Sequence, residues 1–256
     1  MESQNMIKQR KGKEKIIMLT AYDYQMAKIL DEMHIDMILV GDSLGMVFQG
    51  HNDTKSVTMT DMIYHTRAVA RAVKNTLIIG DMPINSYNTK ENGLTNAKRF
   101  LDAGAYGVKI EGNKPEIVNA LIKAGIPVIG HVGMLPQTAE AYRVKGKTAE
   151  EAGMIFRDAV ELDKQGVFSI VLECIPESLA KRITETVKAS TIGIGAGRYC
   201  DGQVLVINDM LGLDEGFKPK FVKKYADLNA VVKDAVGKFK EDVSMGKYPD
   251  EEHTYH

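Results

Sequence analysis

The segment MILVGDS, residues 37–43, places four apolar residues directly before a glycine, an aspartate and a serine. An unbroken apolar run of this length is typical of a strand that is buried on both faces, as in a parallel sheet covered by helices. Similar runs recur along the chain, and most of them are separated by amphipathic stretches. The pattern predicts eight strands, over residues 15–20, 36–40, 76–80, 107–110, 127–131, 168–172, 190–194 and 203–208.

Helical patterns fill the connections. Residues 23–33 form one, residues 60–73 form another that opens at Thr60, and residues 176–188 begin at Pro176, where a missing N–H costs nothing. Eight strands with helical connectors favour a closed (β/α)8 TIM barrel, an α/β fold, over the alternative of an open doubly wound sheet. We expect one domain, residues 1–256, with an amphipathic helical extension at about residues 224–248 outside the repeat.

Charge and cysteine content narrow the class of function. The chain has 33 lysines and arginines against 34 aspartates and glutamates, so no charge excess indicates nucleic acid or an anionic membrane surface as a partner. Two cysteines are too few for a disulfide framework, and the charged N-terminal residues lack an apolar leader pattern. No apolar run reaches the roughly 20 residues of a membrane span. We expect a cytoplasmic protein that binds a small molecule.

Polar side chains lie at the ends of five predicted strands. In a (β/α)8 barrel the chemistry lies at the C-terminal strand ends, which meet at one mouth. Aspartate and serine after a strand are common as helix caps or turn formers, and a single aspartate there is more often one of these than a ligand. Four carboxylates at one mouth would repel one another unless a shared proton or a cation compensates, and oxygen ligands without a Cys/His cluster favour Mg²⁺ over Zn²⁺. The residues concerned are Asp42 with Ser43, Asp81, Lys109 with Glu111, His131 and Glu173.

Three of these side chains have two interpretations that the sequence leaves open. Lys109 lies two residues before Glu111, so both point the same way, and it either binds a substrate carboxylate or forms an internal salt bridge. Glu173 has apolar neighbours that suit a buried general base, and the alternative is a cap for the helix that begins at Pro176. His131 is either a proton shuttle or oxyanion donor, or a structural residue.

A long series of motifs is more distinctive than any one of them. The segments are TAYDY (20–24), VGDSLGM (40–46), QGH (49–51), VTMTDMIYHT (57–66), GDMP (80–83), VKIEG (108–112), GHVGMLPQ (130–137), VLECIP (171–176), IGIGAG (192–197), DGQVLV (201–206) and YPDEEHTYH (248–256). In this order, and over nearly the whole chain, they resemble the ketopantoate hydroxymethyltransferase family.

The resemblance implies a (β/α)8 barrel of the phosphoenolpyruvate/pyruvate type. Members of the family transfer a hydroxymethyl group from 5,10-methylenetetrahydrofolate to 3-methyl-2-oxobutanoate through an enolate that Mg²⁺ stabilises. The product is 2-dehydropantoate, on the route to pantothenate. The resemblance also implies one Mg²⁺ per subunit and a homo-oligomer, often a decamer. We therefore expect a small 2-oxo acid and a folate as the partners of this chain.

The resemblance assigns roles to the residues in the matching motifs. The implied metal ligands are Asp42, Asp81 and Glu111, the implied substrate-binding residues are Asp42, Ser43, Asp81 and Lys109, and the implied proton acceptor is Glu173. His131 stays a secondary candidate. The chain departs from the family pattern at residues 133–137, where GMLPQ replaces the usual GLTPQ, and at Ile84, where an aromatic residue is usual. Neither departure touches an implied ligand.

Two rival functions remain. A Mg²⁺-dependent 2-oxo acid lyase or mutase of the same barrel superfamily would form a similar enolate without folate. Such lyases commonly carry a reactive cysteine on a flexible loop, a setting that neither Cys174, beside Glu173, nor Cys200 has. A non-catalytic barrel scaffold would carry the same carboxylates as structural groups.

Overall fold

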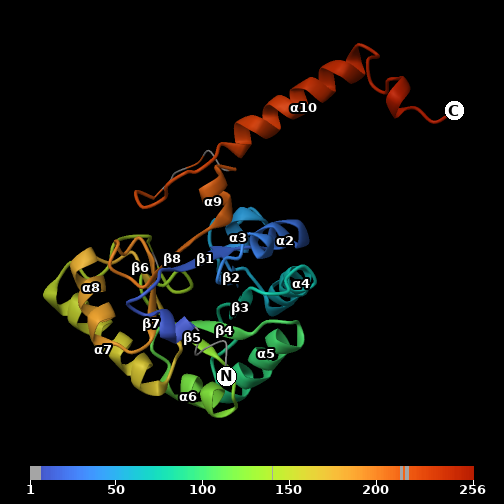
Figure 1. Cartoon of the computed structure of the whole chain (residues 1–256). Coiled ribbons are helices and arrows are strands. Elements are labelled where there is room, and N and C mark those ends of the chain that lie inside the picture. The colour runs from blue at the N-terminus through green and yellow to red at the C-terminus, as the bar shows by residue number, and fades with distance from the viewer. Residues whose placement is uncertain (1–6, 140, 214–215, 217–218) are drawn as a thin grey trace. The chain divides into compact units, whose positions relative to one another are not determined.

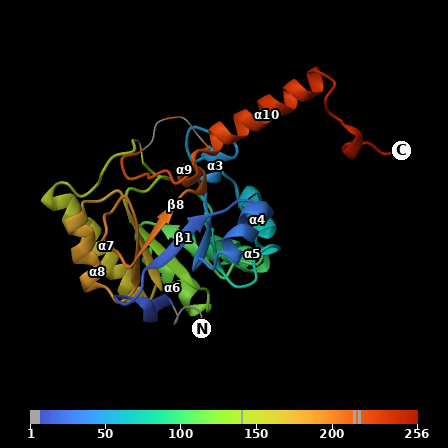
Figure 2. The ribbon, with the colours of Figure 1, turned by 45° about the horizontal axis from the view of Figure 1, so that its top comes forward.

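The computed structural model describes residues 7–139, 141–213, 216 and 219–256, and Figures 1 and 2 show its ribbon from two directions. Contacts within the chain divide it into two compact units, Met1–Val206 and Ile207–His256. The first six residues of the charged N-terminal segment lie outside the described residues. The prediction of one domain over residues 1–256 stays a prediction.

Eight parallel strands form a closed barrel in the first unit, with each strand paired to the next and β8 paired to β1 (Figure 2). The predicted fold is confirmed, and the open-sheet alternative is wrong. Most strand ends lie within two residues of the prediction, but β8 ends three residues early because a helix begins at Ile207. The strands are β1 Ile16–Thr20, β2 Met37–Val40, β3 Leu77–Asp81, β4 Gly107–Glu111, β5 Val128–Gly133, β6 Ser169–Glu173, β7 Ser190–Ile194 and β8 Gly202–Leu205.

Helices α4 to α8 lie outside the ring of strands (Figure 1). Most follow a strand and return the chain to the start of the next one, whereas β7 and β8 are joined without a helix. The helices of the first unit are α2 Tyr24–Glu32, α3 Leu44–Val47, α4 Met59–Ala70, α5 Lys90–Asp102, α6 Pro115–Lys123, α7 Ala149–Gln165 and α8 Glu177–Thr186.

The start of α4 corrects one prediction. Thr58, and not Thr60, caps this helix, because its hydroxyl accepts the backbone N–H of Asp61 while the Asp61 carboxylate accepts the backbone N–H of Thr58. This reciprocal pair is a capping box, which requires an acidic or amide side chain three residues after the cap. Asp61 occupies that position relative to Thr58, and Ile63 occupies it relative to Thr60.

Apolar side chains fill the barrel interior and the layer between strands and helices. Met37, Ile79, Ile129 and Ile192 belong to one buried cluster and are fully shielded from solvent. Each buried aliphatic side chain stabilises the fold by roughly 1.5–3 kcal/mol relative to an exposed one. At Gly80 a Cβ atom would lie 2.2 Å from the ring of Phe100 on α5. The absence of a side chain there lets α5 pack closely against β3, directly before Asp81.

Asp31, near the end of α2, binds the turn that precedes β3. Its carboxylate accepts the backbone N–H groups of Lys74, Asn75 and Thr76, at 3.1, 2.9 and 2.9 Å, in the turn before β3. Burial opposes ionisation, but these three bonds outweigh it and lower the pKa of Asp31 to about 2. We expect Asp31→Asn to lower the free energy of unfolding at pH 7 by about 1–2 kcal/mol.

The pH dependence of that loss has a definite sign. A carboxylate with a depressed folded-state pKa stabilises the fold above its unfolded pKa of about 3.9, and the contribution disappears as the pH falls through the folded-state value. Denaturant unfolding followed by circular dichroism should therefore give curves for Asp31→Asn and the parent chain that converge near pH 2. A difference that stays constant from pH 7 to pH 2 contradicts this role for Asp31.

The second unit contains α9 Ile207–Leu211, α10 Leu228–Ser244 and the short helix η1 Glu251–His253. The predicted C-terminal helix is confirmed as α10, which Asp227 caps by accepting the backbone N–H of Ala230. Among the residues that the structure describes, no helix is both long and apolar enough to cross a membrane.

Candidate active site

The C-terminal ends of the strands bring the predicted site residues together. Because all eight strands are parallel, these ends meet at one mouth of the barrel. Three carboxylates end β3, β4 and β6, and the fourth lies two residues after β2. In that order they are Asp81, Glu111, Glu173 and Asp42. All of them except Glu173 are at most 4% exposed.

Lys109 forms the internal salt bridge that was one of its two interpretations. Its ammonium nitrogen lies 2.7 Å from both carboxylate oxygens of Asp81 and 3.9 Å from Glu111 Oε1. Burial favours the uncharged amine, but the charges of Asp81 and Glu111 outweigh burial and raise the pKa of Lys109 above its usual value. Lys109 therefore places a permanent positive charge among the carboxylates.

One lysine does not balance the negative charge around it. Burial, followed by the neighbouring Asp81 charge, raises the pKa of Asp42 well above its usual value. Burial also raises the pKa of Asp81, although the Lys109 ammonium opposes the rise. Glu111 Oε1 is buried without a hydrogen-bond partner. The cluster therefore carries excess negative charge and a carboxylate oxygen without a hydrogen-bond partner, and both favour the binding of a further cation.

The donor set suits a hard divalent cation. Asp42, Asp81 and Glu111 offer oxygen atoms only, which is the preference of Mg²⁺. Across residues 7–139, 141–213, 216 and 219–256, no three His, Cys, Asp or Glu side chains already have the arrangement of a complete metal site. Mg²⁺ does not require one, because it keeps several water or substrate oxygens in its shell. The residues present fit Mg²⁺ by chemistry and charge.

His131 lies between two of the carboxylates. It is the fourth of six residues in β5, and not the last residue of the strand as predicted. Its Nδ1 lies 3.5 Å from Glu111 Oε1 and its Nε2 lies 3.2 Å from Glu173 Oε2, both at ion-pair distance but without full hydrogen-bond geometry. Burial opposes the charged ring, but Glu111 and Glu173 raise the pKa of His131 to about 9. The ring thus lies between Glu111 of the cluster and Glu173.

The helix-cap alternatives fail for Glu173 and for Ser43. No side chain caps α8 at Pro176, and the Glu173 carboxylate instead faces His131. Ser43 precedes α3 without a side-chain cap bond, and its hydroxyl lies 2.8 Å from the hydroxyl of Tyr22. Both side chains are therefore available for a role other than helix capping.

Gln137 is the residue that the sequence analysis missed. Its side-chain amide donates to Asp42 Oδ2 and to the carbonyl of Met82, both at 2.9 Å, and its backbone N–H donates to Glu111 Oε2 at 3.1 Å. The hydroxyl of Tyr87 donates to the amide oxygen at 2.6 Å, which fixes the orientation of the amide. The only signal in the sequence was the place of Gln137 in the GHVGMLPQ motif.

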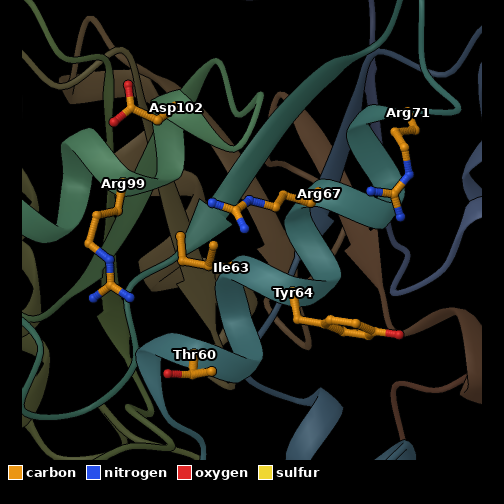
Figure 3. A pocket seen from close by; sticks show the side chains of 7 residues that line it. All are labelled: Thr60, Ile63, Tyr64, Arg67, Arg71, Arg99 and Asp102. Carbon is orange, nitrogen blue, oxygen red and sulfur yellow. The ribbon is translucent and has the colours of Figure 1, made fainter.

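A surface cavity of about 480 Å³ lies elsewhere, between α4 and α5 (Figure 3). It contains none of the predicted site residues. We call it the α4–α5 groove, and it is lined by Thr60, Ile63, Tyr64, Arg67, Arg71, Arg99 and Asp102.

Comparison with known proteins identifies the family. The sequence profile described as ketopantoate hydroxymethyltransferase matches residues 1–251. The chain belongs to the ketopantoate hydroxymethyltransferase family. A 3-methyl-2-oxobutanoate hydroxymethyltransferase of Syntrophomonas wolfei is 51% identical over 253 residues, which cover 96% of this chain and 92% of that protein. The enzyme of the same name from Caldicellulosiruptor saccharolyticus is 51% identical over 254 residues, 97% of this chain and 96% of its own.

Solved structures place the fold of this ketopantoate hydroxymethyltransferase family member among related barrels. Phosphoenolpyruvate phosphomutase from Streptomyces platensis matches with a TM-score of 0.64 at 14% identity, over 100% of this chain and 91% of that one. A 2,3-dimethylmalate lyase, described as a member of the PEP mutase/isocitrate lyase superfamily, matches with a TM-score of 0.62 at 14% identity, over 98% and 91%. At this identity the likeness shows the fold alone, and the fold is the predicted (β/α)8 barrel.

Proposed function

We propose that the chain is a 3-methyl-2-oxobutanoate hydroxymethyltransferase and that its reaction takes place at the mouth described above. Membership of the family supports the assignment of this reaction. One observation carries the choice of site: the Glu173 carboxylate, with 14% of its side chain exposed, borders a buried carboxylate cluster that has excess negative charge. A base beside a cation site is the combination that enolate chemistry requires.

Glu173 is the proposed general base. It removes the proton from C3 of 3-methyl-2-oxobutanoate, since it is the most accessible carboxylate of the four. His131, which contacts Glu173 on one side and Glu111 on the other, fixes the position of that carboxylate and is a positioning residue in this account.

Asp42, Asp81 and Glu111 are the proposed holders of one Mg²⁺ per subunit. When bound, Mg²⁺ supplies positive charge that makes the C3–H of the oxo acid more acidic and stabilises the enolate. Lys109 and Ser43 are the proposed anchors of the substrate carboxylate, and the Lys109 ammonium, which has three N–H donors, takes this role in addition to its salt bridge with Asp81. Held at that end, the oxo acid presents C3 to Glu173.

The proposed transfer joins C3 of the oxo acid to the one-carbon unit of the folate. The electron pair left at C3 forms a carbon–carbon bond to the methylene carbon of 5,10-methylenetetrahydrofolate, and the two bonds from that carbon to folate nitrogens break. Water supplies the hydroxyl group of the product and one proton, and the proton taken by Glu173 is the second of the two that the leaving tetrahydrofolate requires. The product is 2-dehydropantoate, and no residue is assigned to the hydration step.

The rival lyase function finds no support in the cysteines. Burial, and then the charge of Glu173, raise the pKa of the Cys174 thiol to about 12, and burial raises that of Cys200 to about 11. A thiol with so high a pKa is a poor acid or nucleophile near neutral pH. The scaffold alternative gives no reason for an uncompensated carboxylate cluster, which destabilises a protein that does not use it.

Gln137 is a proposed positioning residue, and a substitution there tests it. Gln137→Leu replaces the amide that orients Asp42 with an apolar side chain of similar volume. We expect kcat/KM for the oxo acid to fall by about 10- to 100-fold, the usual effect of losing a group that orients a metal ligand. The affinity of the substrate-free chain for Mn²⁺, measured by electron paramagnetic resonance, should fall in parallel.

Tyr87→Phe is the matched control for Gln137. It keeps the ring and removes only the hydroxyl that fixes the amide, so its effect on Mn²⁺ affinity should have the same direction and a smaller size. A Gln137→Leu protein that keeps the kcat/KM and the Mn²⁺ affinity of the parent chain but has a lower free energy of unfolding would assign Gln137 to packing instead.

We propose that the chain forms a homo-oligomer, a decamer by resemblance to its family, acts in the cytoplasm, and folds residues 1–256 as one barrel domain with its C-terminal extension. Light scattering of the purified chain measures its mass directly. A monomer at micromolar concentration contradicts the oligomer.

Product analysis tests the proposed function. The chain is incubated with 3-methyl-2-oxobutanoate and Mg²⁺, with and without methylenetetrahydrofolate, and the products are separated by mass. We expect 2-dehydropantoate only when the folate is present. Turnover of the oxo acid without folate would favour the lyase or mutase alternative, and no turnover under either condition would favour the scaffold.

A further inference from the structure

We propose that the α4–α5 groove binds a small polyanion with two or more phosphate or carboxylate groups. The groove lies on the outside of the barrel and shares no residue with the mouth that holds the carboxylate cluster (Figure 3). It is therefore a separate site from the one proposed for the transfer reaction.

The charge of the groove is strongly positive. Three guanidinium groups line it, from Arg67 on α4, Arg71 at the C-cap of α4 and Arg99 on α5, against the single carboxylate of Asp102. In the described ranges, the guanidinium groups of Arg67 and Arg71 have neither a hydrogen bond nor an ion pair. Among the residues that the structure describes, Arg99 donates only to the uncharged amide of Asn96, at 3.0 Å. The groove thus concentrates positive charge that no protein carboxylate pairs with.

Arg67 and Arg99 lie on the same side of α4, whereas Arg71 lies apart from them (Figure 3). Figure 3 shows Arg67 directed from α4 toward the side of α5, where Arg99 projects beside Ile63. Guanidinium groups repel one another, and an anion placed between them is bound by paired N–H donors from both helices. Because arginine stays charged at every physiological pH, this repulsion is not relieved by loss of a proton.

Helix electrostatics explain only part of this pattern. Arg67 and Arg99 lie in the last turns of α4 and α5, where the partial negative charge of a helix end favours a cation. That effect acts separately on each helix. It gives no reason for arginines from two helices to line one hollow.

The form of the groove favours a small molecule. Its volume, about 480 Å³, lies within the range of ordinary ligand sites, roughly 300–1,000 Å³. Ile63 lies at its base with only 6% exposure, and Thr60 and Tyr64 are among its lining residues. An apolar base with hydroxyl and guanidinium donors around it matches a compact molecule that carries several acidic groups.

Calorimetric titration of the whole chain tests the proposal. The chain is freed of metal, and two probes are used separately at low salt, inorganic pyrophosphate for phosphate groups and tricarballylate for carboxylates. We expect at least one probe to saturate one site per chain below millimolar concentration. Arg67→Gln and Arg99→Gln, one on each helix, should each weaken binding by about tenfold or more. The preferred probe indicates which acidic group the natural ligand carries.

Arg157→Gln is the matched control, because it removes one exposed positive charge from α7, outside the groove. Its affinity for the probe should equal that of the parent chain. The proposal is overturned if neither probe saturates, if both groove variants bind like the parent chain, or if Arg157→Gln weakens binding as much as they do. It is also overturned if neither probe binds and the groove variants change the mass of the oligomer, since the groove would then be a contact between copies.

Discussion

Glu173→Gln is expected to abolish deuterium exchange at C3 of 3-methyl-2-oxobutanoate and to lower turnover by about 10³-fold. The reason is that glutamine keeps the volume of the side chain and removes its capacity to accept a proton. Binding of the oxo acid should change little, because the groups that hold its carboxylate, Lys109 and Ser43, are intact. Proton NMR in D2O measures the exchange, and calorimetry measures the binding.

Glu177→Gln is the control for this experiment. Glu177 lies four residues further along the chain, at the start of α8, where its carboxylate contacts Arg198 on the surface. Exchange at C3 should proceed in this variant as in the parent chain. Exchange that persists in Glu173→Gln removes Glu173 as the base, whatever the control shows.

Asp81→Asn is expected to raise the Mg²⁺ concentration required for half-maximal activity by at least about tenfold. Asp81 is a proposed metal ligand and the main partner of Lys109, with both of its oxygens 2.7 Å from the ammonium. Removing one partner of a buried ion pair also destabilises a protein by about 3–5 kcal/mol. The residual interaction of Lys109 with Glu111, at 3.9 Å, offsets part of that loss.

Asp31→Asn separates the two effects of Asp81→Asn. It also removes a buried carboxylate and destabilises the fold, but Asp31 lies at the end of α2 and contacts the turn before β3. Its Mg²⁺ requirement should match that of the parent chain. If Asp81→Asn retains the Mg²⁺ dependence of the parent chain, Asp81 does not belong to the metal site.

The fold could be predicted because its signal is local. Each buried strand is an apolar run such as residues 37–40, and a strand of this kind appears in the sequence before any partner is known. The predicted end of β8 was wrong because Ile207 continues the apolar run of the strand in the sequence but begins α9 in the structure. The start of α4 was wrong because two threonines compete for the cap, and only Thr58 has an acidic residue three positions later.

The site was predictable to the extent that it lies on strands. Asp81 and Glu111 end strands, so the parallel topology alone brings them to one mouth. Gln137 and Tyr87 come from the connections after β5 and β3, where no period constrains the position of a side chain. The sequence could not show that Lys109 forms a salt bridge with Asp81, because the two residues lie on different strands and spacing along one strand does not give contacts between strands.

The central claim is that this mouth makes an enolate with the help of a divalent cation, and one experiment tests it most directly. Proton NMR follows C3 of 3-methyl-2-oxobutanoate in D2O with the purified chain, first with a chelator, then with Mg²⁺, and last with methylenetetrahydrofolate added. We expect no exchange with the chelator, exchange with Mg²⁺ alone, and 2-dehydropantoate only after the folate is added. Exchange that is equally fast with the chelator, or its absence under all three conditions, would contradict the account.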